Sequence, residues 1–280
     1  MNGPGGLPRP PLISPAALAE KAAGCPGLLL MTDYDGTLVP LAPTPEEATP
    51  DKELLQVLAR LARKPRCVPA VLSGRRLEDL AALLPVPGIY LAGVHGAAIL
   101  KPDGTVVPLT RQTGPGLKEA IAGLERLAGE SIGSRPGFLL ENKKYALAIH
   151  FRRAAEKDAQ YVLGRFLARG KDLLAQSGLQ LLRGKKVVEV RPRELHKGNA
   201  VRWLKNNFPG HTGIFLGDDT TDEDAFAQIE NGFGVLVSDE PRRSRAGLRL
   251  KSPAEVRLFL EALADRLPDS PFNPSPGGPP

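Results

Sequence analysis

The chain contains only two cysteines, Cys25 and Cys67, in 280 residues. Two thiols are too few for a disulfide framework or for a metal site built from thiolates. No uninterrupted apolar stretch approaches the roughly 20 residues that span a bilayer, and the N-terminus lacks the charged region and apolar core of a secretory signal. These absences exclude a disulfide scaffold and a membrane-spanning protein, and we expect a cytoplasmic protein that binds no membrane.

Basic residues form no long run, although they outnumber the acidic ones by 37 to 31 and give a net charge of +6. Short clusters such as Arg242-Arg243-Ser244-Arg245 occur, but there is no basic helix, no interleaved aromatic platform and no nucleic-acid-binding module. A small anionic substrate explains a mildly basic protein equally well. We therefore expect no nucleic acid as a partner.

Both ends of the chain are rich in glycine and proline. Residues 1–12 and 268–280 contain too few apolar side chains to offset the entropy lost on ordering. We expect disordered tails over residues 1–23 and 268–280.

Strand-like apolar runs and helical spacings alternate between these tails. This alternation covers residues 24–109 and 191–267 and is typical of a parallel sheet covered by helices. Residues 110–190 instead follow the order helix, two strands, helix, two strands. We predict an α/β fold with a Rossmann-like parallel-sheet core, residues 24–109 and 191–267, and an inserted α+β cap domain, residues 110–190. The expected parallel core strands are residues 28–31, 67–72, 89–94, 213–216 and 234–237.

Two acidic residues follow the first predicted strand. Asp33 and Asp35 come directly after Leu28–Met31 and before Gly36. Open α/β sheets bind ligands at the carboxyl ends of their strands. Two close carboxylates are costly unless a cation or an acid–base role separates their protonation states. The alternative is an ordinary polar turn, because aspartate and glycine are common turn residues.

Ser73 and Lys197 lie at the end of a predicted strand and at the start of a predicted helix, respectively. The Ser73 hydroxyl and the Gly74 N–H follow the second predicted strand and can hold a phosphate oxygen, although Ser-Gly is also a common turn. Lys197 begins a predicted helix, where its charge opposes the helix dipole, so local stability does not explain it. An anion bound jointly by the ammonium and the helix N-terminus does explain it. A solvated lysine is the alternative.

The densest acidic segment is Gly217–Glu223, which follows another predicted strand. Asp218, Asp219 and Asp222 would repel one another unless a positive charge lies among them. Oxygen ligands without thiolates favour a hard cation such as Mg²⁺. Helix capping explains the acids from Asp222 onward, but it does not explain Asp218 and Asp219 beside a strand end.

This order of an Asp-x-Asp pair, a serine, a lysine and an Asp-Asp pair resembles the four motifs of the haloacid-dehalogenase-like phosphatases over nearly the whole folded length. The resemblance is closer still to the trehalose-6-phosphate phosphatase family. The segments that carry it are Asp33–Leu38, Leu72–Arg75, Gly93–Gly96, Glu141–Lys144, His150–Arg152, Gly184–Pro192 and Gly217–Glu223.

The resemblance implies a Mg²⁺-dependent phosphatase that hydrolyses trehalose 6-phosphate through an aspartyl-phosphate on Asp33, with Asp35 as acid and base. The implied catalytic residues are Asp33, Asp35, Ser73 and Lys197. The implied substrate-binding residues are Ser73, Gly74, Arg75, His95, Glu141, Lys143, Glu189 and Lys197. The implied metal ligands are Asp33, Asp218 and the backbone carbonyl of Asp35, with Asp219 or Asp222 orienting the ion through its other ligands or through water.

The cap residues, taken alone, leave other interpretations open. Lys143 can be a charged hairpin tip, and two-residue alternation along a strand would place Glu189 on an exposed face. His95 can be a structural histidine. The chain also departs from the family at Ala97-Ala98, where an acidic residue is common.

The catalytic residues would be identical in a phosphatase of another sugar phosphate, such as mannosyl-3-phosphoglycerate or glucosylglycerol phosphate. A receiver-type signalling domain is a second alternative, but its acidic pair precedes the phosphorylated aspartate. A catalytically inactive regulatory subunit is a third, although all the catalytic-type residues are present. We expect hinges near Thr110 and Pro192. The sequence specifies no oligomeric state and is compatible with a monomer.

Overall fold

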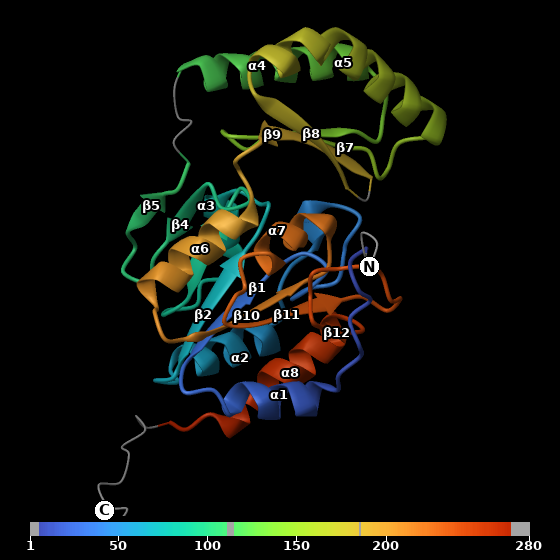
Figure 1. Cartoon of the computed structure of the whole chain (residues 1–280). Coiled ribbons are helices and arrows are strands. Elements are labelled where there is room, and N and C mark those ends of the chain that lie inside the picture. The colour runs from blue at the N-terminus through green and yellow to red at the C-terminus, as the bar shows by residue number, and fades with distance from the viewer. Residues whose placement is uncertain (1–5, 111–114, 185, 270–280) are drawn as a thin grey trace, which may run out of the picture.

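The computed structural model of the chain describes residues 6–110, 115–184 and 186–269. Within them, the larger of two sheets has eight strands in the order β12-β11-β10-β1-β2-β3-β4-β5, as Figure 1 shows in part. Neighbouring strands from β12 to β3 are parallel, and β4 and β5 add an antiparallel hairpin. The strands are β1 (Leu28–Thr32), β2 (Cys67–Leu72), β3 (Tyr90–Gly93), β4 (Ala98–Leu100), β5 (Val106–Pro108), β10 (Thr212–Gly217), β11 (Gly232–Val237) and β12 (Leu248–Leu250).

Helices cover both faces of this sheet (Figure 1). One apolar cluster joins the sheet to four helices and includes Leu18, Leu58, Leu80 and Phe259; these helices are α1 (Pro15–Ala23), α2 (Lys52–Ala62), α3 (Leu77–Leu83) and α8 (Pro253–Arg266). A second cluster joins the other face to α6 (Lys197–Asn207) and α7 (Glu223–Phe226). Short 3₁₀ turns, η1 (Pro45–Glu47) and η2 (Thr220–Asp222), follow β1 and β10. The predicted helix-covered parallel sheet is confirmed.

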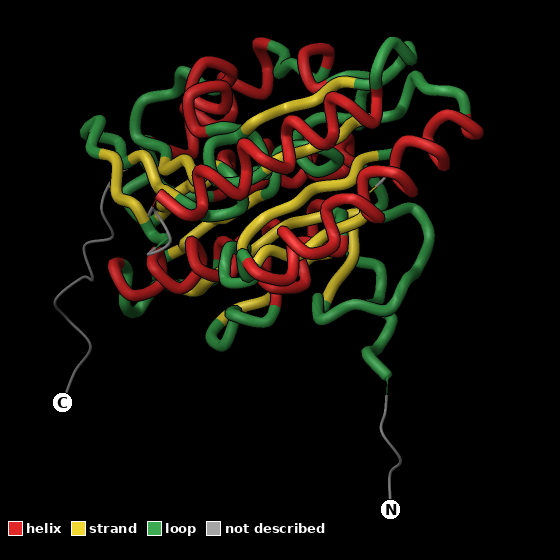
Figure 2. The backbone as a smooth tube through the Cα atoms, turned by 90° about the horizontal axis from the view of Figure 1, so that it is seen from above, coloured by secondary structure: helices red, strands yellow, loops and turns green. Residues whose placement is uncertain are grey.

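A smaller unit follows β5 and is built on its own antiparallel sheet, in the order β6-β7-β9-β8. Its elements are α4 (Pro115–Ile132), β6 (Leu139–Asn142), β7 (Leu147–His150), α5 (Glu156–Gln176), β8 (Leu179–Gly184) and β9 (Val187–Pro192). The two long helices pack together over one face of this sheet, as the view from above shows (Figure 2). The other face is turned toward the larger sheet (Figure 1). We call these elements the small unit and the remainder the core.

Helix α1 corrects the prediction of a disordered tail over residues 1–23. Ser14 caps the helix by accepting a hydrogen bond from the Ala17 N–H at 3.2 Å. Leu18 and Ala22 are fully buried in the cluster that also contains α8. The hydrophobic periodicity of this short alanine-rich segment is weak, and therefore the sequence did not indicate a helix. The helix is stabilised mainly by its packing against the rest of the core.

The segment before α1 also lies against the sheet. The Ile13 N–H donates to the Arg249 carbonyl at 3.0 Å, and the Arg249 N–H donates to the Pro11 carbonyl at 2.9 Å, along the edge strand β12. At the other end, Asp269 pairs with the buried Lys64. The expected tails at residues 1–5 and 270–280 lie outside the described residues. Among the helices that are described, none combines the length and apolar character of a membrane span.

Candidate active site

Asp33 and Asp35 lie where β1 ends, at the edge of the core that faces the small unit. The Asp33 N–H donates to the Leu216 carbonyl of β10 at 2.8 Å, which continues the strand pairing by one residue. Gly36 then has a φ of +83°, in the left-handed region that glycine adopts without strain. The Asp33 side chain is 7% exposed and that of Asp35 is 33% exposed. This turn therefore holds two carboxylates at different depths.

Lys197 lies between two buried carboxylates. Its Nζ is 2.6 Å from Asp33 Oδ1 and 2.7 Å from Asp222 Oδ1. Burial raises the pKa of Asp33 well above its ordinary value; Lys197 lowers this pKa, whereas Asp222 and Asp218 raise it further. Burial by itself would lower the pKa of Lys197, but the two carboxylates outweigh it and raise that pKa. The ammonium therefore stays charged, and an additional positive charge nearby would favour ionised Asp33.

Asp33, Asp218 and Asp222 form a group whose candidate ligand oxygens all lie within 4.8 Å of one another. Asp218 comes close to the β1 turn, because a Cβ on Gly36 would lie only 2.3 Å from Asp218 Oδ2. Three carboxylates thus lie close together, the Lys197 ammonium contacts two of them, and every candidate ligand atom is an oxygen. This donor set and its excess negative charge fit a hard divalent cation such as Mg²⁺.

The Asp35 carboxylate is instead bound by Arg75. Arg75 Nε donates to Asp35 Oδ2 at 2.8 Å, and Nη2 donates to Oδ1 at 2.6 Å. The same guanidinium lies over the Tyr34 ring, 4.9 Å from its centroid. This two-pronged pair gives Asp35 a defined orientation. The predicted metal contact of Asp35 concerned its backbone carbonyl and stays a prediction.

Asp219 is a capping residue in this structure and is not part of the carboxylate group among the described residues. Its carboxylate accepts the Thr220 N–H at 2.7 Å, and its own N–H donates to Asp222 Oδ2 at 2.9 Å. Asp222 therefore uses one oxygen for Lys197 and the other for the backbone of this turn. Helix capping therefore explains Asp219 as well, which corrects the expectation from the sequence. Asp222 belongs both to this cap and to the carboxylate group.

Ser73 and Gly74 follow β2 beside the same edge of the sheet. The Ser73 hydroxyl oxygen accepts the Arg75 N–H at 3.1 Å and is buried. A Cβ on Gly74 would lie 2.6 Å from the His95 imidazole, so that only glycine permits this approach. The hydrogen bond confirms the turn, and the phosphate-binding role of Ser73 stays a prediction.

Charged residues of the small unit pair with one another and contact a histidine of the core. Lys143 Nζ is 2.8 Å from Glu189 Oε2, and Glu189 Oε1 is 2.8 Å from His95 Nε2 of the core. Glu141 Oε2 is 2.9 Å from His150 Nε2. Lys143 and Glu189 are only 7% and 8% exposed, which excludes the exposed hairpin tip and the exposed strand face considered from the sequence. The alternation argument failed for Glu189 because the core covers the face that would otherwise meet solvent.

These pairs have a defined charge state near neutral pH. Burial alone would raise the pKa of Glu189, but His95 and Lys143 hold it well below its ordinary value. Burial lowers the pKa of His95 to about 4, although Glu189 opposes this effect. Burial would also lower the pKa of Lys143, but Glu189 and Glu141 raise it. The network thus offers a carboxylate, an ammonium and a neutral imidazole shielded from water.

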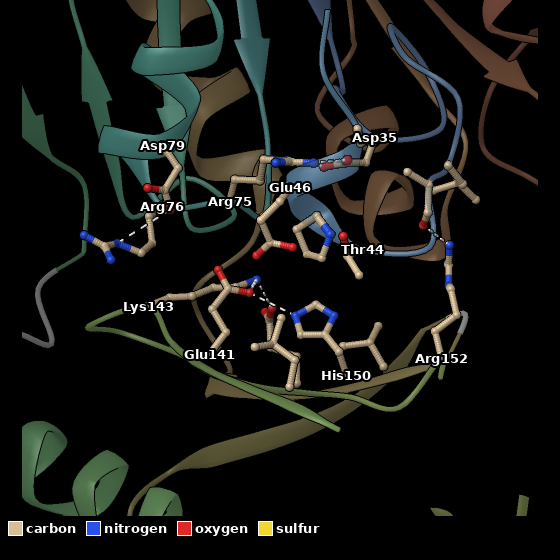
Figure 3. Close-up of a pocket in the computed structure, with 18 of the residues that line it drawn as sticks. Asp35, Thr44, Glu46, Arg75, Arg76, Asp79, Glu141, Lys143, His150 and Arg152 are labelled. Atoms are coloured by element: carbon tan, nitrogen blue, oxygen red, sulfur yellow. Dashed lines mark hydrogen bonds and ion pairs between the residues drawn. The ribbon is translucent and has the colours of Figure 1, made fainter. Parts of the chain in front are cut away.

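A pocket of about 620 Å³ lies between the core and the small unit. Figure 3 shows Arg75 and Asp35 on the core side and Glu141, Lys143 and His150 on the side of the small unit. Every site residue named from the sequence lines this pocket except two, Ser73 and Asp222, which are buried beside it. The pocket also has walls that no motif marked: Thr44, Glu46, Arg76 and Asp79.

Arg152 ties the two units together at the rim of this pocket (Figure 3). Its Nη1 donates to the Ala42 carbonyl in the loop after β1. The sequence indicated Arg152 only as part of a family segment, and the loop around Ala42 and Glu46 was not indicated. The one signal that points to this loop is its place after a central strand, where α/β sheets bind ligands.

Solved structures share this fold. The C-terminal domain of Candida albicans trehalose-6-phosphate phosphatase has a TM-score of 0.80 with this chain, covers 92% of it and 99% of its own length, and is 24% identical. Aspergillus fumigatus trehalose-6-phosphate phosphatase has a TM-score of 0.64 at 26% identity, over 91% of this chain and 99% of its own. The predicted haloacid-dehalogenase-like α/β fold is confirmed.

Sequence comparisons agree with the structural ones. The family model for trehalose-phosphatase matches residues 31–254. The trehalose-phosphate phosphatase of Mycobacterium marinum is 35% identical over 248 residues, which are 84% of this chain and 61% of that protein. That of Mycobacterium tuberculosis H37Rv is 35% identical over 253 residues, 86% of this chain and 62% of its own length. The chain thus spans about three fifths of the length of these relatives. It belongs to the trehalose-phosphatase family.

Proposed function

We propose that the chain is a Mg²⁺-dependent phosphatase that hydrolyses trehalose 6-phosphate to trehalose and phosphate. The observation that carries this proposal is the buried contact of Lys197 with Asp33 in the lining of the pocket, beside the carboxylates of Asp218 and Asp222. Membership in the trehalose-phosphatase family supports the choice of substrate. The pocket volume of about 620 Å³ is within the range that small-molecule sites have.

Asp33 is the proposed nucleophile. Its carboxylate oxygen would attack phosphorus, the bond from phosphorus to the sugar oxygen would break, and an aspartyl-phosphate would form. Lys197 orients this carboxylate before substrate arrives and afterwards neutralises a phosphoryl oxygen, with Ser73 as a further donor. A Mg²⁺ ion held by Asp33 and Asp218, with Asp222 beside it, would supply positive charge that keeps Asp33 ionised and balances the phosphoryl charge.

Asp35 is the proposed acid and base. It would give a proton to the departing sugar oxygen and later take one from the water that hydrolyses the aspartyl-phosphate. In the structure both of its oxygens accept hydrogen bonds from Arg75. Asp35 must therefore leave at least one of these bonds before it can present a proton to the substrate. Arg75 would at the same time become available to the phosphate or the sugar.

The sugar would be recognised by the charged residues of the small unit. Glu141, Lys143 and Glu189 all line the pocket, and their present ion pairs provide donors and acceptors at fixed positions. Hydroxyl groups of a disaccharide would insert among these partners. His95 would support this arrangement by its contact with Glu189. Because the catalytic aspartates are common to related sugar phosphatases, the small unit is the part that discriminates among sugars.

The small unit is the proposed cap domain, residues 110–190, and would open to admit substrate and close to exclude water. Its contacts with the core at Arg152 and at Glu189 would then break and re-form, with hinges near Thr110 and Pro192. We further propose that the protein acts in the cytoplasm, which is supported by its two free cysteines.

Phosphate release from a panel of phosphosugars tests this function. We expect release from trehalose 6-phosphate with Mg²⁺, none after chelation, and a loss of at least about 1,000-fold in Asp33→Asn, as for removal of a covalent nucleophile. Asp103→Asn is the matched control, because Asp103 lies at an exposed hairpin tip, where it pairs with Lys101 and accepts the Thr105 N–H. Release from a different sugar phosphate would keep the chemistry and overturn the sugar assignment. Release from none would favour a catalytically inactive regulatory subunit.

A further inference from the structure

Arg242 connects the loop after β11 to the acidic loop after β10. Its Nη2 donates to the carbonyl of Asp218 at 3.2 Å and to that of Asp219 at 3.1 Å. Its Nη1 donates to Glu223 Oε1 at 2.9 Å. One guanidinium is thus shared by two successive backbone carbonyls and a carboxylate. The rigid fork of arginine suits such a set of acceptors, whereas the single ammonium of lysine does not.

Glu223 holds this guanidinium in place from the other side. Its second oxygen, Oε2, accepts the Arg245 N–H at 2.7 Å, so the carboxylate is bound to the loop after β11 at two points. The side chains of Arg242 and Glu223 are 31% and 19% exposed, so their pairing is only partly screened by solvent. The sequence had marked Arg242 only as part of a short basic cluster. In the structure its side chain instead forms hydrogen bonds within the protein.

The backbone that Arg242 binds, at Asp218 and Asp219, must stay in position for the carboxylate group to form. Asp218 approaches Gly36 closely and belongs to the same group as Asp33 and Asp222. Repulsion among three carboxylates favours movement of the most exposed of them, and Asp218 is the one that is not buried. Bonds to the carbonyls of Asp218 and Asp219 resist that movement, because they hold the backbone of this loop at two successive peptide units. Arg242 makes both of these bonds.

We propose that Arg242 is a positioning residue that holds Asp218 in metal-binding geometry before a metal arrives. This inference rests on the metal site of the proposed function. A positioning role of Arg242 and a purely electrostatic effect of its charge predict opposite changes in metal affinity when the side chain is removed. A positive charge close to the site repels a divalent cation, so removal of the charge alone would strengthen metal binding. Loss of a group that orients a ligand weakens metal binding, typically by 10-fold to 100-fold.

Mn²⁺ binding to the metal-free full chain, followed by electron paramagnetic resonance without substrate, tests the proposal. We expect Arg242→Met to raise the Mn²⁺ dissociation constant about 10-fold or more. Arg245→Met is the matched control, because its exposed side chain makes no hydrogen bond or ion pair with the described residues and only its backbone contacts Glu223. It should stay within about two-fold of wild type. Unchanged or tighter binding in Arg242→Met would overturn the positioning role.

Amide hydrogen exchange in the metal-free protein provides a second readout. In Arg242→Met, peptides covering residues 217–223 should exchange faster, and peptides from β6 and β7 should not change. A variant with wild-type exchange in this loop would overturn the proposal even if its metal affinity fell. Failure of the wild type itself to bind Mn²⁺ would instead overturn the proposed metal site, and with it this role of Arg242.

Discussion

Lys197→Met removes the ammonium that contacts two buried carboxylates and keeps a side chain of similar length. The Nζ atom lies 2.6 Å from Asp33 and 2.7 Å from Asp222, whose side chains are 7% and 0% exposed. Removing one partner of a buried ion pair typically costs about 3–5 kcal/mol, because the charge left behind is uncompensated. We expect a loss of that size in the free energy of unfolding at pH 8 in the presence of a chelator. The whole free energy of unfolding of a typical domain is only about 5–15 kcal/mol.

This loss should become smaller as the pH falls. Burial already raises the pKa of Asp33 in the wild type, and removal of Lys197 takes away the group that lowers it. A carboxyl whose pKa is higher in the folded than in the unfolded state stabilises the fold below its unfolded pKa, and this contribution is lost as the pH rises through the folded pKa. Protonated Asp33 needs no ammonium. The difference between variant and wild type should therefore be larger at pH 8 than at pH 5.

Urea unfolding followed by circular dichroism measures both effects. Lys205→Met is the matched control on the same helix. The Lys205 side chain is 21% exposed, and its Nζ donates to the Gln228 carbonyl at 3.0 Å and lies 3.6 Å from the exposed Glu230. Such a pair contributes about 1 kcal/mol or less. Equal stability of the two variants in chelator, or a larger deficit at pH 5 than at pH 8, would refute the reasoning.

Gly36→Ala should weaken divalent-metal binding at least about 10-fold in calorimetric titration, because the new Cβ would lie 2.3 Å from Asp218 Oδ2 and φ at this residue is +83°. Gly104→Ala is the control, because Gly104 also has a positive φ but lies in open space, and its metal binding should be unchanged. If the small unit closes on substrate, the radius of gyration of Asp33→Asn from X-ray scattering should decrease when trehalose 6-phosphate and Mg²⁺ are added. The same radius with and without these ligands would count against closure.

The core of the fold could be predicted because its central strands are buried on both faces and read as continuous apolar runs. The strand expected at residues 67–72 is β2, with the same bounds, and the strand expected at residues 28–31 is β1, extended by Thr32. Helix α1 and the three-residue strand β12 were not predicted, since both are stabilised by neighbours rather than by their own sequence pattern.

The sequence by itself determined which acids, which serine and which lysine are candidates for the site. The acids and the serine follow core strands, and parallel strands end at one edge of a sheet. Only the tertiary structure decided how these groups are paired. It brings Lys143 to Glu189 across 46 residues and Arg75 to Asp35 across 40. It also assigns Arg242 to the Asp218 loop. Such pairs depend on distances between elements that are far apart in the chain, and no local spacing encodes those distances.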